Sequence, residues 1–413
     1  MIIAKKIALS AMLTTLLTTN SYAQSQDWRS PENRIYLSTG YFENGTNSNE
    51  GMAYFPLSVY ETYNWGFQKL SFGDSGLSRF VSWLIGGQIL PTYLSGVLNT
   101  SFHEYGHATR FRYYGFNDIT YRPNDSSTTT TSFFQMVFDR LGSSGDGAST
   151  SANGYTDIYI TQNREVDTVI TAGGMNNEIL LSKLMSERIH ERGGSVPDLS
   201  YYLLAKLGPY GYSGLDSRTG DPYLLERNYS AVGKQITRTD FKNYYLFSAL
   251  ASGTFFSLVW GNIDYLANGT QLIKPLKIAG FSLPDFYTYL NAKGLSTEGV
   301  LHYDVNENIK LGLSYEQIFK GDDYKQISPE VIYKVKNQNG FIKAYSIKPQ
   351  LVLGFDSSNV DVGGSVLTEA TSQYDVGMFL KYTYYNKKTL YGERNITFAS
   401  NANELLAGAF YVF

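Results

Sequence analysis

The chain has 413 residues, a formal net charge of −3 and no cysteine. Its length allows two domains or one large domain. No basic patch is interleaved with stacking aromatic residues, which argues against a nucleic-acid partner, and the absence of cysteine excludes disulfides and a cysteine-linked lipid anchor. The chain holds 35 tyrosines but only 17% charged residues. Tyrosine has an apolar ring and a polar tip, which suits membrane interfaces and wet grooves.

Residues 1–23 are typical of a cleaved secretory signal peptide. Lys5 and Lys6 precede an apolar stretch at 7–17 that is too short to span a bilayer, and Ser21-Tyr22-Ala23 fits a cleavage site. We therefore expect an exported protein. An exported chain without cysteine fits the bacterial cell envelope better than a small eukaryotic secreted domain.

The next region, residues 24–75, is polar and aromatic. An alternating run at 34–41 places Ile35, Leu37 and Tyr41 on one face. This alternation, with turn-forming residues near 44–51, predicts an N-terminal region of one or two strands.

Residues 76–275 are predicted to form a helical domain. The best helical segments are 76–115, 165–192 and 241–267, with Pro91 expected to kink or divide the first. The polar stretch at 124–154 predicts a loop, which is either a flexible lid over a cleft or a disordered insertion. Two short alternating runs that flank it, 118–122 and 156–160, are predicted to pair as a hairpin.

The last region, residues 276–413, is predicted to form antiparallel strands of about ten residues, the repeat length of transmembrane barrels. Apolar and polar residues alternate in 309–319 and 374–384, and shorter runs at 331–336, 347–355, 360–367 and 404–413 behave similarly. A last alternating strand that ends on Phe413 resembles the C-terminal strand of bacterial outer-membrane β-barrels. The fold class expected is thus α+β, with a helical domain before a C-terminal barrel of about 8–10 strands. The alternative is a soluble β-sandwich with one wet face.

The sequence His103-Glu104-Tyr105-Gly106-His107 matches the pattern H-E-x-x-H. On a helix, residues four apart lie on one face, so both imidazoles can bind one Zn²⁺. Glu104 would lie beside the metal, where it can accept a proton from an activated water molecule. Residues 92–114 contain no proline, which favours the required helix. The alternative is a helix whose histidines only pack or cap.

A catalytic zinc needs a third protein ligand. His302 lies on the polar face of a predicted strand, and His190 lies near a helix end, where it can interact with the helix dipole. Glu178 is the better candidate, because a glutamate among apolar neighbours is costly to bury without a cation. Its alternative role is that of a carboxylate favoured at a helix N-terminus. Weaker rivals are Glu165, Glu187 and Glu191.

His103-Glu104-x-x-His107, followed by Asn177-Glu178, resembles the gluzincin branch of zinc metallopeptidases. The resemblance covers only these two segments. It implies His103, His107 and Glu178 as zinc ligands and Glu104 as general base. Related enzymes place an aspartate four residues after the ligand glutamate, where this chain has Ser182. No tyrosine, histidine or arginine stands out for stabilising the oxyanion.

The apolar stretches 80–102 and 245–263 are of membrane-spanning or nearly spanning length. They raise an alternative, an intramembrane zinc protease of the inner membrane. Such enzymes usually take a ligand from an Asp-Gly element in a later helix, whereas Asp146-Gly147 lies in a Ser/Gly-rich stretch. Both apolar stretches also contain polar residues, which makes them weak insertion signals.

The function expected is therefore a zinc metalloendopeptidase of the cell envelope, exported to the outer membrane, with membrane lipid and a peptide or protein substrate as partners. Periplasmic and inner-membrane locations are the alternatives. A non-enzymatic outer-membrane barrel (a porin, adhesin or assembly factor) is an alternative of another class. A third is an envelope amidase or peptidoglycan hydrolase, because the motif does not distinguish a peptide from other carbonyl substrates.

Overall fold

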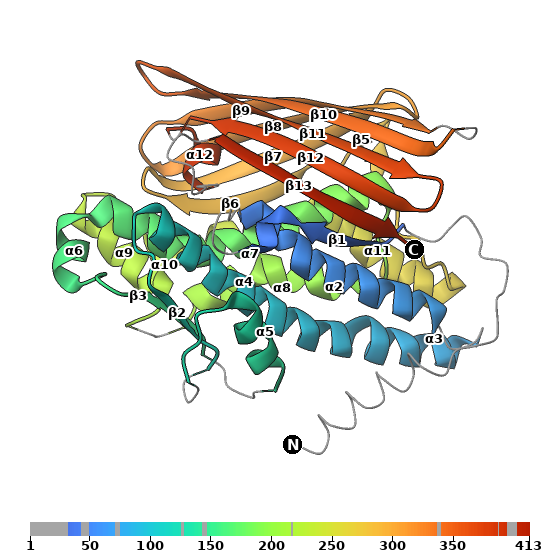
Figure 1. The fold of residues 1–413 in the computed structure, drawn as a ribbon, viewed down its shortest axis with the longest axis horizontal. Helices are drawn as coiled ribbons and strands as arrows, with labels where there is room; N and C mark the ends of the chain where they lie inside the picture. Colours follow the sequence, from blue (N-terminus) through green and yellow to red (C-terminus); the bar gives the residue numbers. More distant parts are fainter. Residues whose placement is uncertain are drawn as a thin grey trace.

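The computed structural model describes residues 32–42, 49–70, 75–124, 128–142, 147–215, 218–336, 340–386, 388–394 and 403–413. The predicted signal peptide at 1–23 lies outside these residues. The described chain is α+β, with an N-terminal helical region followed by a large antiparallel sheet. The helices form one layer and the sheet forms the other (Figure 1).

The N-terminal region differs from its prediction. Strand β1 (Arg34–Ser38) is present and is followed by a short 3-10 turn, η1 (Thr39–Tyr41). However, most of the described part of 24–75 forms helix α2 (Asn49–Lys69). The strand predicted in 34–41 is therefore confirmed as β1, whereas a second strand is not found in the other described residues of this region, which are mostly helical. The apolar residues Ala53, Leu57 and Tyr60 recur at helical spacing (i, i+4, i+7), and all three are buried.

A 38-residue helical stretch, Gly76–Tyr113, follows. It consists of α3 (Gly76–Ser82), a π-helical turn η2 (Trp83–Ile89) and α4 (Leu90–Tyr113). Pro91 has no backbone N–H to donate, and the wider turn directly precedes it. The predicted break at Pro91 thus takes the form of a local widening. By length and composition this stretch is able to cross a membrane.

Further helices complete the layer beneath the sheet. They are α5 (Phe133–Gly142), α6 (Asp157–Gln162), α7 (Arg164–Arg192), α8 (Asp198–Ser213), α9 (Asp221–Ala231), α10 (Arg238–Leu250) and α11 (Gly253–Asn268). The short α12 (Leu390–Arg394) lies at the sheet itself, against its inner side (Figure 1). A bend of 51° separates α10 from α11. The predicted segments 165–192 and 241–267 are confirmed as helical.

The described residues of the polar stretch at 124–154 form regular structure where a loop was predicted. They include α5 and strand β3 (Ser149–Ala152), which pairs with β2 (Ile119–Arg122). The hairpin partner predicted for 118–122 is therefore wrong, because 157–162 forms α6 instead. Thr156 accepts a hydrogen bond from the Tyr159 backbone, which caps that helix.

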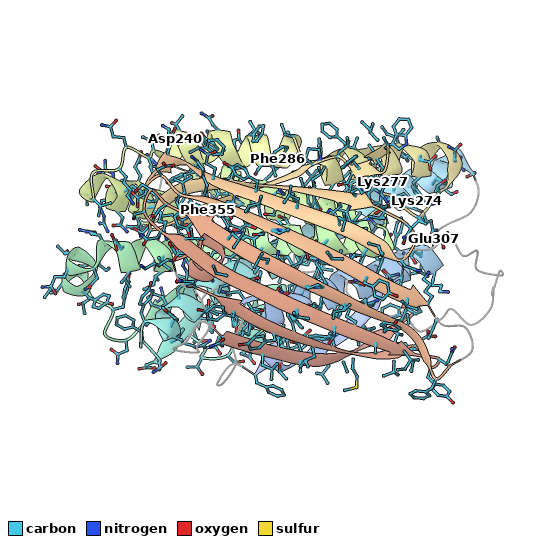
Figure 2. All side chains as sticks on the ribbon, turned by 90° about the horizontal axis from the view of Figure 1, so that it is seen from above. Asp240, Lys274, Lys277, Phe286, Glu307 and Phe355 are labelled. Carbon is cyan, nitrogen blue, oxygen red and sulfur yellow. The ribbon has the colours of Figure 1, made fainter. Side chains whose placement is uncertain are left out.

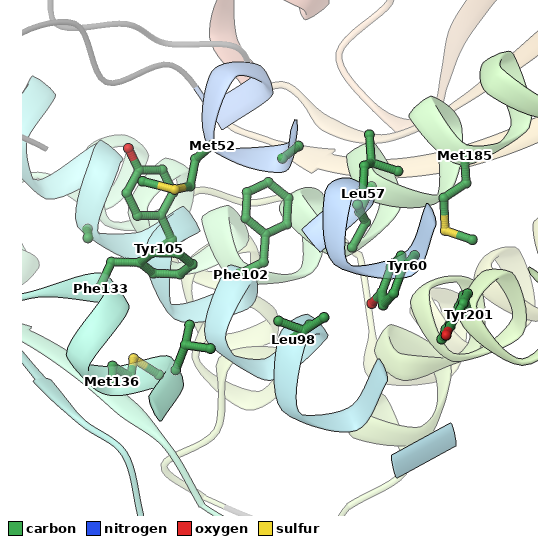
Figure 3. Packing of buried hydrophobic residues seen from close by; sticks show 14 of the residues in the cluster. Met52, Leu57, Tyr60, Leu98, Phe102, Tyr105, Phe133, Met136, Met185 and Tyr201 are labelled. Carbon is green, nitrogen blue, oxygen red and sulfur yellow. The ribbon is translucent and has the colours of Figure 1, made fainter. Parts of the chain in front are cut away.

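The main apolar core lies inside the helical layer. Residues from α2, α4, α5, α7 and α8 meet there, as Figure 3 shows for Met52, Phe102, Tyr105, Phe133 and Tyr201. Tyr60 and Tyr201 stack with ring centroids 4.0 Å apart. This core fixes α4, the helix that carries the histidine pair, against α2 and α8.

The C-terminal sheet has eleven strands. Their bounds are β4 (Lys277–Ile278), β5 (Phe281–Ser282), β6 (Asp285–Asn291), β7 (Gly294–Asp304), β8 (Ile309–Gly321), β9 (Lys325–Lys336), β10 (Ile342–Phe355), β11 (Val360–Ser372), β12 (Val376–Tyr385) and β13 (Asn403–Val412), together with β1. The order is β1-β13-β12-β11-β10-β9-β8-β7-β5-β4, and β6 also pairs with β7. The predicted strands are confirmed, and β1 joins them. Within the described residues no pairing joins the two ends of this path, so the predicted barrel closure is not found.

The two faces of the sheet differ sharply. We call the side that points away from the helices the outer face. Its exposed apolar residues are Ile35, Leu37, Leu311, Leu313, Tyr315, Phe319, Val331, Tyr333, Tyr345, Ile347, Leu351, Phe355, Val360, Val362, Val366, Val376, Met378, Leu380, Tyr382, Tyr384, Leu405 and Tyr411. Figure 2 views this face from above. The intervening residues, such as Ser314 and Glu316 of β8, point toward the helices and are buried.

Candidate metal centre

The histidine pair lies in the C-terminal half of α4, as its sequence predicts. His103 and His107 are one turn apart, their ring centroids are 5.0 Å from each other, and both side chains are buried. Their Nε2 atoms point to one carboxylate. Oδ2 of Asp221 lies 2.9 Å from Nε2 of His103 and 3.1 Å from Nε2 of His107. These three residues form a group that could hold a metal ion.

Sequence reasoning did not find Asp221. It is the first residue of α9, after Gly220 and before Pro222, where an acidic residue is usually explained by the helix dipole. Its backbone N–H donates to the hydroxyl of Tyr212 at 3.0 Å, and the Tyr212 ring lies against His103. No local pattern marks this aspartate as a ligand, because it lies more than a hundred residues from the histidines.

The other ring nitrogens have acceptors as partners. Nδ1 of His107 lies 2.8 Å from the backbone carbonyl oxygen of Ile170, and Nδ1 of His103 lies 2.6 Å from Oε1 of Glu178. A carbonyl oxygen can only accept, so Nδ1 of His107 must carry the proton. In the neutral imidazole, Nε2 then presents a lone pair to the Asp221 carboxylate. Two acceptors face each other unless the ring is protonated or a cation lies between them.

Glu178 is brought to the site, but to the far side of His103. It lies on α7, is buried, and contacts Nδ1 rather than the point where the two Nε2 atoms converge. A carboxylate in this position orients a ligating imidazole and makes it more basic. The group of three that converges on one point contains Asp221.

The other candidate residues lie elsewhere. His190 contacts Asp285 at 3.1 Å, and His302 lies 3.5 Å from Glu330 on the inner side of the sheet. Glu187 and Glu191 both approach Lys348. Glu165 is exposed in the first turn of α7. Asp146, the ligand that the intramembrane alternative requires, lies outside the described residues.

Glycines allow α4 and α7 to approach closely. A Cβ atom on Gly106 or Gly173 would lie less than 3.0 Å from the backbone of the other. A Cβ on Gly174 would lie 2.6 Å from Cε1 of His103 and nearer still to two other ring atoms. This contact between helices brings the Ile170 carbonyl and Glu178 within reach of the imidazoles. A hydrogen bond from the Asn177 amide to the Phe102 carbonyl, at 3.0 Å, stabilises the contact between α7 and α4.

Glu104 is buried next to the histidines. The hydroxyl of Thr150 donates to Oε2 of Glu104 at 2.7 Å and lies 3.1 Å from its backbone oxygen. Thr150 belongs to β3, in the polar stretch that was predicted to be a lid or an insertion. The paired strands β2 and β3 therefore pack against the motif, and Thr150 of β3 holds the Glu104 carboxylate.

The electrostatics of the site couple the two histidines to their carboxylate partners. Burial lowers the pKa of both imidazoles, but the carboxylates raise it further, and the net pKa of each lies above its ordinary value. Burial raises the pKa of the Asp221 carboxyl, but His107 and His103 lower it further, and the net pKa is well below the ordinary value. Asp221 is therefore ionised at neutral pH. Burial raises the pKa of Glu178, an effect that His103 opposes without cancelling.

The donor set fits a zinc ion. Ligand atoms on one tetrahedral zinc, at ~2.0–2.1 Å from the metal, lie roughly 3.4 Å from one another. The observed separations of 2.9 and 3.1 Å between the imidazole nitrogens and Asp221 are a few tenths of an ångström shorter. Small side-chain rotations would open this space. Two imidazoles and one carboxylate leave a fourth position for water or substrate, as catalytic zinc sites do.

No family model matches the chain, and no curated protein or solved structure matches it either.

Proposed function

We propose that the chain is a zinc-dependent hydrolase of the cell envelope that cleaves peptide bonds, with His103, His107 and Asp221 as metal ligands. The observation that carries the proposal is the convergence of both Nε2 atoms on one buried carboxylate oxygen, Oδ2 of Asp221. Nδ1 of His107 donates to the Ile170 carbonyl, so in the neutral ring its Nε2 points a lone pair toward that carboxylate. A divalent cation satisfies all three groups at once.

Each residue of the site then has a chemical role. When bound, the metal supplies Lewis acidity toward a water molecule and a substrate carbonyl. Glu104 accepts the proton of that water and returns it to the leaving amine. Thr150 holds the Glu104 carboxylate in place through its hydroxyl. Glu178 orients His103 and therefore acts through the ligand, not on the substrate.

Hydrolysis of a carbonyl substrate is supported by the arrangement of base and ligands, and the resemblance to gluzincins favours a peptide as that substrate. The carboxylate of Glu104 directly follows the first histidine on the same helix, which is the arrangement that water activation requires. An export signal predicted at 1–23 favours the cell envelope, and the apolar outer face of the sheet favours a location in its outer membrane.

Metal content and cleavage, measured together, test the proposal. Purified protein should hold about one zinc per chain by elemental analysis, as one three-ligand site implies. Glu104→Gln should keep the metal and lose cleavage of a fluorogenic peptide library. An exposed acidic residue, Asp157, offers the matched control as Asp157→Asn. Protein that is folded yet binds no zinc, or a Glu104→Gln variant that cleaves as well as wild type, would overturn the proposal.

A second pair of variants separates the roles of Asp221 and Glu178. Asp221→Ala removes a ligand and should abolish stoichiometric zinc. Glu178→Gln keeps the side-chain shape and should retain zinc with roughly 10–100-fold weaker affinity, as expected for a residue that orients a ligand. Glu165→Gln, an exposed change on the same helix, is the control. The reverse outcome would make Glu178 the third ligand, as the resemblance to gluzincins implies.

A further inference from the structure

The sheet carries its charges on the side that faces the protein. Lys183 of α7 binds Glu298 of β7 at 2.7 Å, and Lys381 of β12 binds Glu50 of α2 at 2.6 Å. Lys348 of β10 lies 3.3 Å from Glu187. These charged side chains are largely buried between the two layers. The helices therefore meet the sheet through ion pairs and hydrogen bonds.

The opposite side is apolar, and the described residues leave most of its area uncovered. In β12 five alternate residues point outward and are exposed, from Val376 to Tyr384, and none of them is charged. The outer face continues in this way across β8 to β13 and onto β1. An antiparallel sheet in water buries its apolar side against the protein and exposes its polar side. This sheet does the reverse.

The dimensions of the outer face match a bilayer. Strands β8 to β13 contain between 10 and 14 residues. At ~3.3 Å per residue they extend about 33–46 Å, enough to cross a hydrocarbon layer of ~30 Å with a tilt. Charged residues lie near both ends of the sheet. Figure 2 shows Asp240 near one end and Lys277 and Glu307 near the other.

A second apolar surface lies in the helical layer. Along α3 and η2, Phe80, Leu84, Ile85 and Ile89 are exposed. Only 33% of the most apolar window of this helical stretch is buried. In Figure 1 the sheet and α3 lie on opposite sides of the molecule, with α2 between them. A second copy of the chain seated on the sheet would leave this helix uncovered, whereas lipid covers both.

We propose that the outer face of the sheet and the exposed side of α3 and η2 contact the hydrocarbon core of a membrane. In this arrangement the helices α2 and α7 fill the polar side of the sheet, which a closed barrel would leave as a lumen. The chain is then embedded by a sheet on one side and by a helix on the other. This inference rests on the membrane location in the proposed function and specifies which surfaces contact lipid, but it does not depend on the metal centre.

The absence of cysteine makes the test direct, because single cysteines can be introduced and labelled with a nitroxide. Full-length protein with a label at Met378, Leu313 or Ile85 is reconstituted into phosphatidylethanolamine–phosphatidylglycerol vesicles. Glu307, exposed beyond the strand ends, provides the matched control site. Accessibility to oxygen, which partitions into lipid, and to a water-soluble nickel chelate is then measured by electron paramagnetic resonance.

The proposal expects oxygen accessibility several-fold above nickel accessibility at the first three sites, and the opposite at the Glu307 site. Circular dichroism confirms that each variant is folded. High nickel accessibility at Met378 and Leu313 would overturn the proposal, because it places the sheet in water. Low accessibility to both reagents, with a dimer in sedimentation, would also overturn it and assign the face to a second copy. A water-exposed label at Ile85 alone would remove the helical half of the proposal.

Discussion

Gly174→Ala links helix packing to metal binding in one substitution. A Cβ atom at this position would lie 2.6 Å from Cε1 of His103, and closer to Nε2 and Cδ2. Carbon atoms prefer separations of ~3.5 Å or more, so the ring must retreat by roughly 1 Å. Metal–ligand distances tolerate only about ±0.2 Å. We therefore expect zinc affinity to fall by at least ~100-fold, about 2.7 kcal/mol.

Helix propensity predicts the opposite sign for the stability of the same variant. Alanine is favoured over glycine inside a helix by ~1 kcal/mol. Overpacking against the buried His103 should cost about 1–3 kcal/mol, so the net effect is destabilising or near zero. Competition with a chromophoric chelator measures zinc affinity, and denaturation measures stability.

Substitutions at two further glycines are controls for the effect of Gly174→Ala on zinc affinity. A Cβ on Gly208 would meet Oε2 of Glu178, the movable end of a side chain, so Gly208→Ala should weaken zinc binding less. Gly96 is exposed on α4 with nothing within 4 Å of its Cβ position, and Gly96→Ala should leave zinc binding unchanged. If Gly174→Ala binds zinc like wild type and is more stable, the close contact of α7 with His103 is refuted.

Three other predictions follow from buried groups. Removal of zinc with a chelator should lower the melting temperature of wild type but not of Asp221→Ala, and equal shifts would show that the metal is bound elsewhere. Arg394→Met leaves Glu316 buried without its partner at 2.6 Å and should cost about 3–5 kcal/mol of unfolding free energy, whereas adding Glu316→Leu should restore most of it. Burial lowers the pKa of Lys206 to about 7. Between pH 7 and the pKa of Lys206 in the unfolded chain, the unfolded chain binds more protons than the folded chain. The free energy of unfolding is therefore highest above the unfolded pKa and falls as the pH falls toward 7. The stability of wild type relative to Lys206→Met should therefore rise by up to ~1.4 kcal/mol per pH unit between pH 7 and 9, and parallel denaturation curves in detergent would contradict this.

Local periodicity was enough to predict much of the fold. The alternation in 309–319 and 374–384 predicts β8 and β12 because side chains on a strand repeat every two residues. The long apolar helix before the motif is predicted for a similar reason. The prediction for the region after β1 is wrong. Helix α2 is rich in aromatic and small residues, so its helical spacing is a weak signal beside the clear alternation of the strand.

The site could be predicted only where its residues are close in sequence. His103, Glu104 and His107 share one helical turn, so spacing alone places them together. Asp221 meets them through the packing of α9 on α7, which no sequence window contains. Glu178 was found for a sound reason, the cost of burying a carboxylate among apolar residues. In the structure Nδ1 of His103 is the partner that offsets this cost. Burial therefore predicts that Glu178 belongs to the site, but not which atom it contacts.

The ion pairs between the two layers have a consequence for how the molecule assembles. Each pair joins a helix residue to a strand residue, as Lys183 to Glu298 and Lys381 to Glu50 do. If the sheet slid along the helices by one residue, about 3.3 Å, the strand charges would move away from their helix partners and would be buried unpaired, at several kcal/mol each. An apolar interface would tolerate such a slip. The ion pairs between the layers therefore select one alignment of the sheet on the helices and disfavour alignments that are displaced by a residue.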